Sequence, residues 1–218
     1  MRFLKVRTNM VEQQVRPWHV LNEAVLSVMS QIPRETFVPH DYLNLAYSDT
    51  DIPLGDHQTM LSPKMVGNAL QALALQGDEK VLEVGTGTGY ITACLSKLAA
   101  TVISVEIQPA LSAQAEKNLS SLQCRNITLE QGDGSQGWEI YAPYDAIVVT
   151  GSYPLGVPKK ICEQLHPKGG RLFAICGLAP AMQAVRIERQ SKSYTTHILF
   201  ETVVPALSNV PLPPKFQF

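Results

Sequence analysis

A glycine-rich stretch at residues 80–90, KVLEVGTGTGY, limits the folds open to this chain more than any other feature. An apolar run leads into three glycines at alternate positions, Gly85, Gly87 and Gly89, and a helix-like segment follows. This pattern is typical of a buried strand that turns sharply into a helix whose first backbone amides stay open to a ligand. Glycine suits the turn because a Cβ atom would block the close approach of a ligand to the backbone. The stretch predicts a nucleotide-like ligand.

The spacing of the glycines differs from that of dinucleotide-binding proteins. Their fingerprint is G-x-G-x-x-G, and here Tyr90 occupies the place of the third glycine. Glu83, two residues before Gly85, would repel a pyrophosphate but attract an ammonium or sulfonium group. A second β-rich run ends at Glu106, whose carboxylate can accept hydrogen bonds from both ribose hydroxyls. Asp133 lies between two glycines after a third such run, and in the class of enzymes that these motifs resemble, named below, this position implies a contact with the adenine edge.

These motifs resemble those of class I S-adenosylmethionine-dependent methyltransferases, which carry E-x-G-x-G-x-G at the end of their first strand. The resemblance implies S-adenosyl-L-methionine as the methyl donor and S-adenosyl-L-homocysteine as the product. The residues expected to bind the donor are Glu83, Gly85, Thr86, Gly87, Gly89, Glu106, Ile107, Gly132, Asp133 and Gly134. Each motif alone has a simpler explanation: a plain connection for the glycine loop, a surface acid for Glu106 and a turn residue for Asp133. Their order and spacing together favour a donor site.

Apolar strands alternate with helices through the middle of the chain. The strands are expected near residues 80–85, 101–106, 126–130, 144–150 and 171–176. Alternation at this spacing predicts a parallel sheet covered by helices on both faces. Two later β-prone runs, at residues 183–190 and 195–204, predict an antiparallel hairpin. We therefore expect an α/β, Rossmann-like class I methyltransferase fold with a mostly parallel seven-stranded sheet and an antiparallel C-terminal hairpin.

Capping residues indicate where the first helices begin. Asn9 and Glu12 form a possible capping box for a short helix that ends near Pro17. Asn22 is expected to cap a second helix that ends before Pro33. Residues 36–60 are rich in turn formers and are expected to be irregular. Further helices are expected from Ser62-Pro63 onward, with serine as the N-cap, and at residues 158–165.

Three regions follow from these patterns. Residues 1–60 are expected to be a helical and irregular extension on the substrate side, and residues 61–205 the S-adenosylmethionine-binding core. Residues 206–218 contain several prolines and are expected to be an irregular tail. The length of 218 residues suits one domain with a short appendage.

The composition indicates which partners to expect. The formal net charge is −1 and the basic side chains are scattered, so we expect no nucleic-acid partner. The four cysteines lie far apart without a C-x-x-C pair, which favours reduced thiols over disulfides and predicts no metal site. No apolar run reaches membrane-spanning length and the first residues lack the apolar core of a signal peptide, so we expect a cytoplasmic protein without a membrane partner. Monomer and dimer both remain open.

Several sequence blocks, most of them outside the donor motifs, resemble a particular family, the protein-L-isoaspartate O-methyltransferases. The blocks are MVEQQVRP at 10–17, PRETFVP at 33–39, AYSD at 46–49, PLGDHQT at 53–59, GDGSQGW at 132–138 and PYDAIVVT at 143–150. The resemblance implies methylation of the α-carboxylate of L-isoaspartyl residues, a protein-repair reaction whose substrates are damaged proteins and peptides. Such a carboxylate is already ionised at neutral pH, so the reaction requires no general base.

One departure from the family concerns the acceptor side. The family has a serine beside the substrate, and the matching position here is Leu61. Ser62 could replace it if the loop shifts by one residue, although its simpler role is helix N-cap. Thr59 keeps a hydroxyl and is our preferred substrate-side donor; Thr59 and Ser62 are thus the candidate catalytic residues. Ser135 likewise replaces a tryptophan of the family. The alternatives are a methyltransferase of another small-molecule or protein acceptor, and a non-catalytic S-adenosylmethionine-binding homologue.

Overall fold

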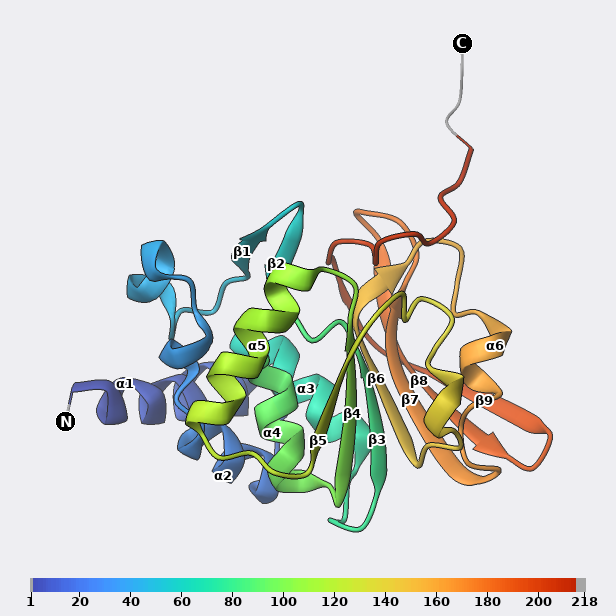
Figure 1. Cartoon of the computed structure of the whole chain (residues 1–218), viewed down its shortest axis with the longest axis horizontal. Helices are drawn as coiled ribbons and strands as arrows, with labels where there is room; N and C mark the ends of the chain where they lie inside the picture. Colours follow the sequence, from blue (N-terminus) through green and yellow to red (C-terminus); the bar gives the residue numbers. More distant parts are fainter. Residues whose placement is uncertain (1, 215–218) are drawn as a thin grey trace.

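The computed structural model of the protein describes residues 2–214. Its centre is a seven-stranded sheet in the order β5-β4-β3-β6-β7-β8-β9, and β1 and β2 form a separate two-stranded sheet (Figure 1). The strands are β1 (Ile52–Gly55), β2 (Gln58–Met60), β3 (Lys80–Val84), β4 (Thr101–Glu106), β5 (Ile127–Gln131), β6 (Ala146–Tyr153), β7 (Lys168–Cys176), β8 (Met182–Gln190) and β9 (Ser193–Thr202). The predicted α/β fold with a mostly parallel seven-stranded sheet is confirmed.

The chain order of the strands reverses between β3 and β6. Strands β3, β4 and β5 are parallel and follow one another to one edge, whereas β6 and β7 continue the parallel sheet on the other side of β3. Strand β8 is antiparallel to β7, and β9 to β8, as expected for a C-terminal hairpin. In open α/β sheets, ligands bind outside the carboxyl ends of the strands at such a reversal. We therefore expect a ligand site at the carboxyl ends of β3, β4 and β6.

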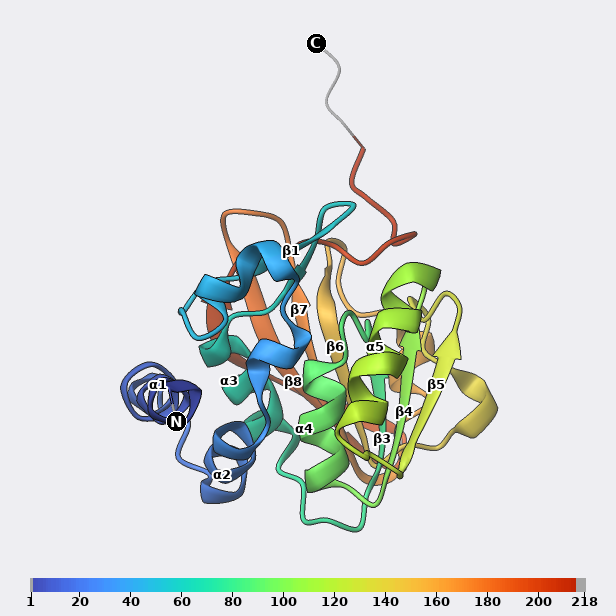
Figure 2. The same cartoon turned by 60° about the vertical axis from the view of Figure 1, so that its left-hand side comes forward.

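Helices cover both faces of the sheet, unequally (Figures 1 and 2). The α-helices are α1 (Arg2–Met10), α2 (Glu23–Gln31), α3 (Pro63–Leu73), α4 (Tyr90–Leu98), α5 (Pro109–Ser121) and α6 (Lys159–Cys162). The shorter helical segments are the π-helix η1 (Val11–Val15) and the 3-10 helices η2 (Arg16–Trp18), η3 (Arg34–Phe37), η4 (His40–Leu45) and η5 (Glu139–Tyr141). The buried side chains of α3, α4 and α5 belong to one apolar cluster, and those of α6 to a second. Within residues 2–214, no helix is both long and apolar enough to cross a bilayer.

The predicted helix at residues 158–165 is shorter than expected. Only α6 is α-helical there, because the residues that follow it pair with Tyr144, just before β6, instead. The backbone N–H of Tyr144 donates to the carbonyl of Gln164 at 2.8 Å, and that of His166 donates to the carbonyl of Tyr144 at 2.7 Å. The side chain of Gln164 is also engaged, since its Oε1 accepts from the backbone N–H of Trp138 at 2.8 Å. Long-range pairing thus overrides the local helical pattern.

The capping box predicted at Asn9 and Glu12 is wrong. Helix α1 already runs through Asn9, and the chain stays helical through η1 and η2. Arg7 fastens α1 to the rest of the chain, because its guanidinium donates to the carbonyl of Gln31 at 2.9 Å and pairs with Glu35 at 3.3 Å. These contacts join segments more than 20 residues apart, which a local sequence pattern does not reveal.

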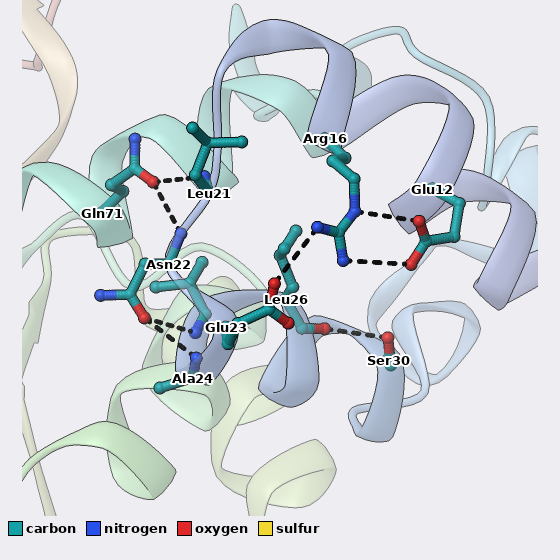
Figure 3. Close-up of polar contacts among 10 residues, drawn as sticks. Glu12, Arg16, Leu21, Asn22, Glu23, Ala24, Leu26, Ser30 and Gln71 are labelled. Carbon is teal, nitrogen blue, oxygen red and sulfur yellow. Dashed lines mark hydrogen bonds and ion pairs between the residues drawn. The ribbon is translucent and has the colours of Figure 1, made fainter.

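Gln71 of α3 holds the segment that precedes α2. Its Oε1 accepts hydrogen bonds from the backbone N–H groups of Leu21 at 2.6 Å and Asn22 at 3.0 Å (Figure 3). Its Nε2 donates to the carbonyl of His19 at 2.9 Å. Asn22 is the N-cap of α2, as predicted, and its Oδ1 accepts from the backbone N–H of Ala24 at 3.0 Å. The N-terminal helices are in this way anchored to the core of the fold.

The segment predicted to be irregular, residues 36–60, contains η4 and the β1–β2 hairpin. Ile52 pairs with Met60 across the hairpin, and the exposed turn contains Asp56 and His57, both with positive φ. The strands are four and three residues long, too short to show an alternating pattern. In Figure 1 the hairpin lies at the same end of the molecule as the segment that follows β9.

The segment after β9 returns along the end of β6. The backbone N–H of Ser152 donates to the carbonyl of Pro205 at 3.0 Å, and that of Leu207 donates to the carbonyl of Ser152 at 3.1 Å. The predicted irregular tail, residues 206–218, is described as far as residue 214, and residues 215–218 lie outside the described residues. The beginning of the tail is therefore packed against the sheet.

Candidate functional site

The loop after β3 turns the chain into α4 at positions that require glycine. Gly85 has a φ of 92°, and a Cβ atom there would lie 2.2 Å from Oγ1 of Thr150 on β6. Gly89, the N-cap of α4, has a φ of 94°, a conformation that residues with a Cβ atom rarely adopt. The predicted strand, glycine turn and helix are thus confirmed, and the turn is packed against the neighbouring strand.

A cavity opens beside this loop, at the ends of β3 and β4 and along the later part of β6. It has about 890 Å³ of empty space, part of which is open to solvent. The predicted donor-binding residues that line it are Glu83, Gly85, Thr86, Gly87, Glu106, Ile107, Gly132, Asp133 and Gly134. Gly89, the N-cap of α4, is not among the lining residues, and a Cβ atom there would meet Leu119 of α5 instead.

Glu106, the last residue of β4, is fixed by two backbone amides. Its Oε2 accepts from the N–H of Gly87 at 2.8 Å, and its Oε1 accepts from the N–H of Gln108 at 3.0 Å. The carboxylate thereby joins the glycine loop to the turn after β4. Each carboxylate oxygen has further lone pairs, so both can accept another hydrogen bond from a ligand.

Asp133 lies beyond β5 and is held from two sides. Its Oδ1 accepts from the backbone N–H of Ser135 at 2.9 Å, and its Oδ2 accepts from Nδ2 of Asn209 at 3.1 Å. Burial alone would raise the pKa of Asp133, but these hydrogen bonds outweigh it and hold that pKa below its ordinary value. Asp133 is therefore ionised near neutral pH.

Glu83 is a completely buried carboxyl in the centre of the sheet, with 0% of its surface exposed. Its Oε2 accepts from Oγ1 of Thr92 at 2.5 Å and from Oγ of Ser104 at 2.7 Å. Ser104 is its register partner on β4, and the Ser104 hydroxyl also lies 2.6 Å from Oγ1 of Thr86. Burial raises the pKa of Glu83 to about 8, although the two hydroxyl donors act in the opposite direction.

The acceptor side of the cavity is formed by β2 and the residues around it. Thr59 and Leu61 line the cavity, and Oγ1 of Thr59 is buried without a hydrogen-bond partner among the described residues. Ser62 is buried but is not a lining residue; its backbone N–H donates to Oδ1 of Asp51 at 2.7 Å. Ser62 precedes α3 as its N-cap residue, yet its side chain makes no capping hydrogen bond. Of the two candidate hydroxyls, the structure brings Thr59 to the cavity.

Arg34 is a supporting residue to which the sequence pattern assigned no role. Its side chain is fully buried, Nε donates to the carbonyl of Ala46 at 2.9 Å, and Nη2 donates to the carbonyl of Leu61 at 2.8 Å. The guanidinium also lies 4.9 Å from the ring centre of Tyr90, which lines the cavity. Burial lowers the pKa of Arg34 from its ordinary value. Arg34 lies in the block PRETFVP, which resembles the family, but this resemblance does not indicate that its side chain is buried.

The C-terminal segment supplies a further part of the wall. Pro205, Leu207 and Ser208 line the cavity, and the Asn209 side chain binds Asp133. The sequence pattern predicted only an irregular tail, since nothing in a run of prolines and small residues indicates where it packs. This segment therefore contacts the donor side of the cavity.

The lining has the chemistry that the expected methyl donor requires. Four buried polar atoms on the wall lack a partner within residues 2–214: Oγ1 of Thr59, Oε1 of Glu83, Oγ1 of Thr88 and the hydroxyl of Tyr90. Buried polar atoms are normally paired, so their concentration at one cavity indicates a ligand with complementary groups. The carboxylates at Glu106 and Asp133 suit hydroxyl and amine donors. The residues present therefore fit a nucleoside that carries a positive charge.

A family model and curated relatives match this chain to the same family. The family model described as Protein-L-isoaspartate(D-aspartate) O-methyltransferase matches residues 5–210. A protein-L-isoaspartate O-methyltransferase of Syntrophus aciditrophicus (strain SB) is 42% identical over 191 residues, which are 88% of this chain and 87% of that relative.

Solved structures show the same fold. A protein-L-isoaspartate O-methyltransferase is similar with a TM-score of 0.77 and 25% identity, over 89% of this chain and 63% of that chain. A putative protein-L-isoaspartate O-methyltransferase from Plasmodium falciparum, solved in complex with S-adenosyl-L-homocysteine, has a TM-score of 0.78 at 19% identity. That similarity covers 93% of this chain and 98% of the other.

Proposed function

Because the chain belongs to the protein-L-isoaspartate O-methyltransferase family, we propose that it methylates the carboxylate of L-isoaspartyl residues in damaged proteins, with S-adenosyl-L-methionine as donor. One observation carries this proposal. A single cavity joins the glycine loop and its acids, on one side, to the hydroxyl of Thr59 and the apolar end of β2, on the other. Donor and acceptor can therefore meet in one partly enclosed space.

The donor half of the site would hold the cofactor through carboxylates and backbone. Glu106 and Asp133 are both held by hydrogen bonds from the chain and keep lone pairs free for hydroxyl and amine groups. The glycine loop gives close access to the backbone. When bound, S-adenosylmethionine supplies a methyl group on a positively charged sulfur.

The acceptor half would position a carboxylate rather than activate it. An acid with an ordinary pKa near 4 is ionised at neutral pH, so alignment and the removal of water are the main requirements. The apolar side chains of Leu54, Met60 and Leu61 line this part and would exclude water. We assign Thr59 to orient the acceptor, because its hydroxyl is at the cavity and has no partner in the described chain. Ser62 remains a weaker candidate, since it is not a lining residue.

We further propose the regional roles and the compartment. Residues 1–60 act as the substrate-side extension, supported by the contribution of the β1–β2 hairpin to the cavity wall. Residues 61–205 are the donor-binding core, and the described part of the tail, from residue 206, closes its C-terminal side. All four cysteines are free, which supports a reducing compartment, the cytoplasm.

The test compares two synthetic peptides that differ at one residue, L-isoaspartyl in one and L-aspartyl in the other. We expect labelled methyl groups from S-adenosylmethionine to be transferred to the isoaspartyl peptide only. Binding of S-adenosylhomocysteine is measured by calorimetry in parallel. If this ligand binds but neither peptide is methylated, the isoaspartyl acceptor is wrong, and the apolar Leu61 in place of the family serine favours a different acceptor. If the ligand does not bind, the donor is wrong as well.

A further inference from the structure

Glu83 is a buried acid at the cavity, and the proposed reaction has so far assigned no step to it. One carboxylate oxygen, Oε2, accepts two short hydrogen bonds, whereas Oε1 is buried and has no partner within residues 2–214. The residue nevertheless belongs to the cavity wall. An ionised carboxylate in this place would carry an unpaired charge, unless a positive group lies in the cavity.

The groups that pack around Glu83 do not neutralise it. On β4, the nearby Glu106 is another acid and raises the pKa of Glu83 further. On α4, burial keeps Cys94 and Tyr90 neutral, because it raises the pKa of Cys94 to about 12 and that of Tyr90 well above its ordinary value. On β6, the register partner is the apolar Val148. No basic side chain in the described chain hydrogen bonds to Glu83.

The two nucleosides that the proposed reaction uses differ in one charge. Methyl transfer converts a sulfonium and a carboxylate into a thioether and an ester, so one positive and one negative charge disappear together. Glu83 would then be left without the positive charge that its ionised form needs.

We infer that Glu83 makes the site distinguish donor from product by proton exchange: it is ionised while the sulfonium donor is bound and takes up one proton from solvent when the neutral product occupies the cavity. This inference rests on the proposed use of S-adenosylmethionine. A bound cation favours the charged form of a neighbouring carboxyl, and a neutral ligand in a buried site favours the protonated form.

Proton linkage gives the inference a measurable form. If donor binding releases a proton from Glu83, the affinity for S-adenosylmethionine rises with pH below the pKa of the free protein, about 8. If product binding takes up a proton, the affinity for S-adenosylhomocysteine falls above that pH. The ratio of the two affinities therefore increases by up to about tenfold per pH unit across this range.

The experiment is calorimetry with each nucleoside alone, without acceptor, between pH 6 and 9.5 in buffers of different ionisation enthalpy. The amino group of each nucleoside also titrates in this range, so the number of protons is taken as the difference between the wild-type protein and Glu83→Gln. We expect up to one proton of difference, of opposite sign for the two nucleosides. Equal proton counts in the two proteins, with both nucleosides bound, overturn the inference but leave the proposed function intact.

A second variant covers the case in which Glu83→Gln does not fold. Thr92→Val removes one hydroxyl donor to the carboxylate with little change in shape, and should move the pH dependence of the affinity ratio to higher pH. A ratio that does not change with pH in the wild-type protein, or a profile that does not move in Thr92→Val, contradicts the inference. Failure of either nucleoside to bind at any pH contradicts the proposed donor instead.

Discussion

The side chain of Asn209 donates a hydrogen bond from Nδ2 to Oδ2 of Asp133 at 3.1 Å, and so joins the C-terminal segment to the donor side of the cavity. The two residues are 76 positions apart in the chain. In the same segment, Pro205, Leu207 and Ser208 form part of the cavity wall, and Pro205 and Leu207 make backbone hydrogen bonds with Ser152. This contact makes the C-terminal segment part of the donor site, and it leads to the first prediction.

Replacing Asn209 with alanine should loosen this wall. A hydrogen bond to a charged acceptor contributes about 1.5–3 kcal/mol at most, and this one is solvent-exposed, so we expect S-adenosylhomocysteine to bind about 2- to 10-fold more weakly. Faster dissociation should account for the change, measured by surface plasmon resonance. The control is Leu212→Ala, an exposed side chain of the same segment. Equal dissociation rates for both variants and the wild type would rule out a role for the contact.

Glu106 should matter more for the donor than any surface acid. Glu106→Ala removes a buried carboxylate that can accept ligand hydroxyls and also releases the amides of Gly87 and Gln108. We expect S-adenosylhomocysteine binding to weaken by about 1.5–3 kcal/mol, as measured by calorimetry. Glu139→Ala, at an exposed position outside the cavity, provides the matched control. Unchanged affinity in Glu106→Ala would show that this acid does not bind the donor.

Substitutions of Thr59 and Ser62, the two candidate hydroxyls, should have different effects on kcat/KM. Thr59→Val removes a buried hydroxyl without a partner among the described residues, so the free energy of unfolding should stay the same or rise slightly. Its kcat/KM for the isoaspartyl peptide should nevertheless fall about tenfold, which corresponds to one lost hydrogen bond of about 1.4 kcal/mol. Ser62→Ala should leave kcat/KM nearly unchanged, because its side chain lies outside the cavity lining. Steady-state kinetics and thermal unfolding test both; the reverse ranking would favour Ser62 as the acceptor-side hydroxyl.

Arg34 should contribute mainly to stability. Arg34→Met leaves the carbonyls of Ala46 and Leu61 without their buried donor, while it also removes a buried charge that is costly to desolvate. We expect the free energy of unfolding to fall by roughly 1–3 kcal/mol in chemical denaturation. The control Arg16→Met removes two exposed ion pairs, with Glu12 and Glu23, and should change the free energy of unfolding by less than about 1 kcal/mol. Similar values for the two variants would contradict the structural role of the buried guanidinium.

Glu83 should make the stability of the free protein depend on pH. Its pKa is raised from 4.5 to about 8 by burial, so the folded state holds this proton more tightly than the unfolded state. The corresponding stability is fully present below about pH 4.5 and is lost as the pH rises through 8, with a slope of up to about 1.4 kcal/mol per pH unit. Urea denaturation of the wild type and Glu83→Gln at pH 5, 6.5 and 8 measures the difference, which should shrink over this interval. A constant difference would show that Glu83 is ionised throughout.

The donor side of the cavity was predictable because its residues lie in short local patterns. The glycine loop follows a strand directly, and Glu106 ends the next strand, so strand and turn rules place both at one edge of the sheet. The acceptor side depends on contacts between distant segments, and so does the C-terminal segment that borders the donor side. The burial of Arg34 depends on Leu61 and Tyr90, and the position of Asn209 depends on Asp133. No local sequence pattern predicts such contacts between distant residues. The β1–β2 hairpin was not predicted either, because its strands are too short to show a pattern.

The pairing of β3 with β4 places Ser104 directly beside Glu83. A shift of this pairing by one residue would bring the apolar Ile103 or Val105 next to the acid and remove one of its two hydroxyl donors. The same shift would also carry Glu106 away from the amide of Gly87. Recognition of the nucleoside thus requires one particular alignment of two neighbouring strands. Ligand binding by a refolded sample is therefore a direct assay of correct strand alignment, which helix content alone does not report.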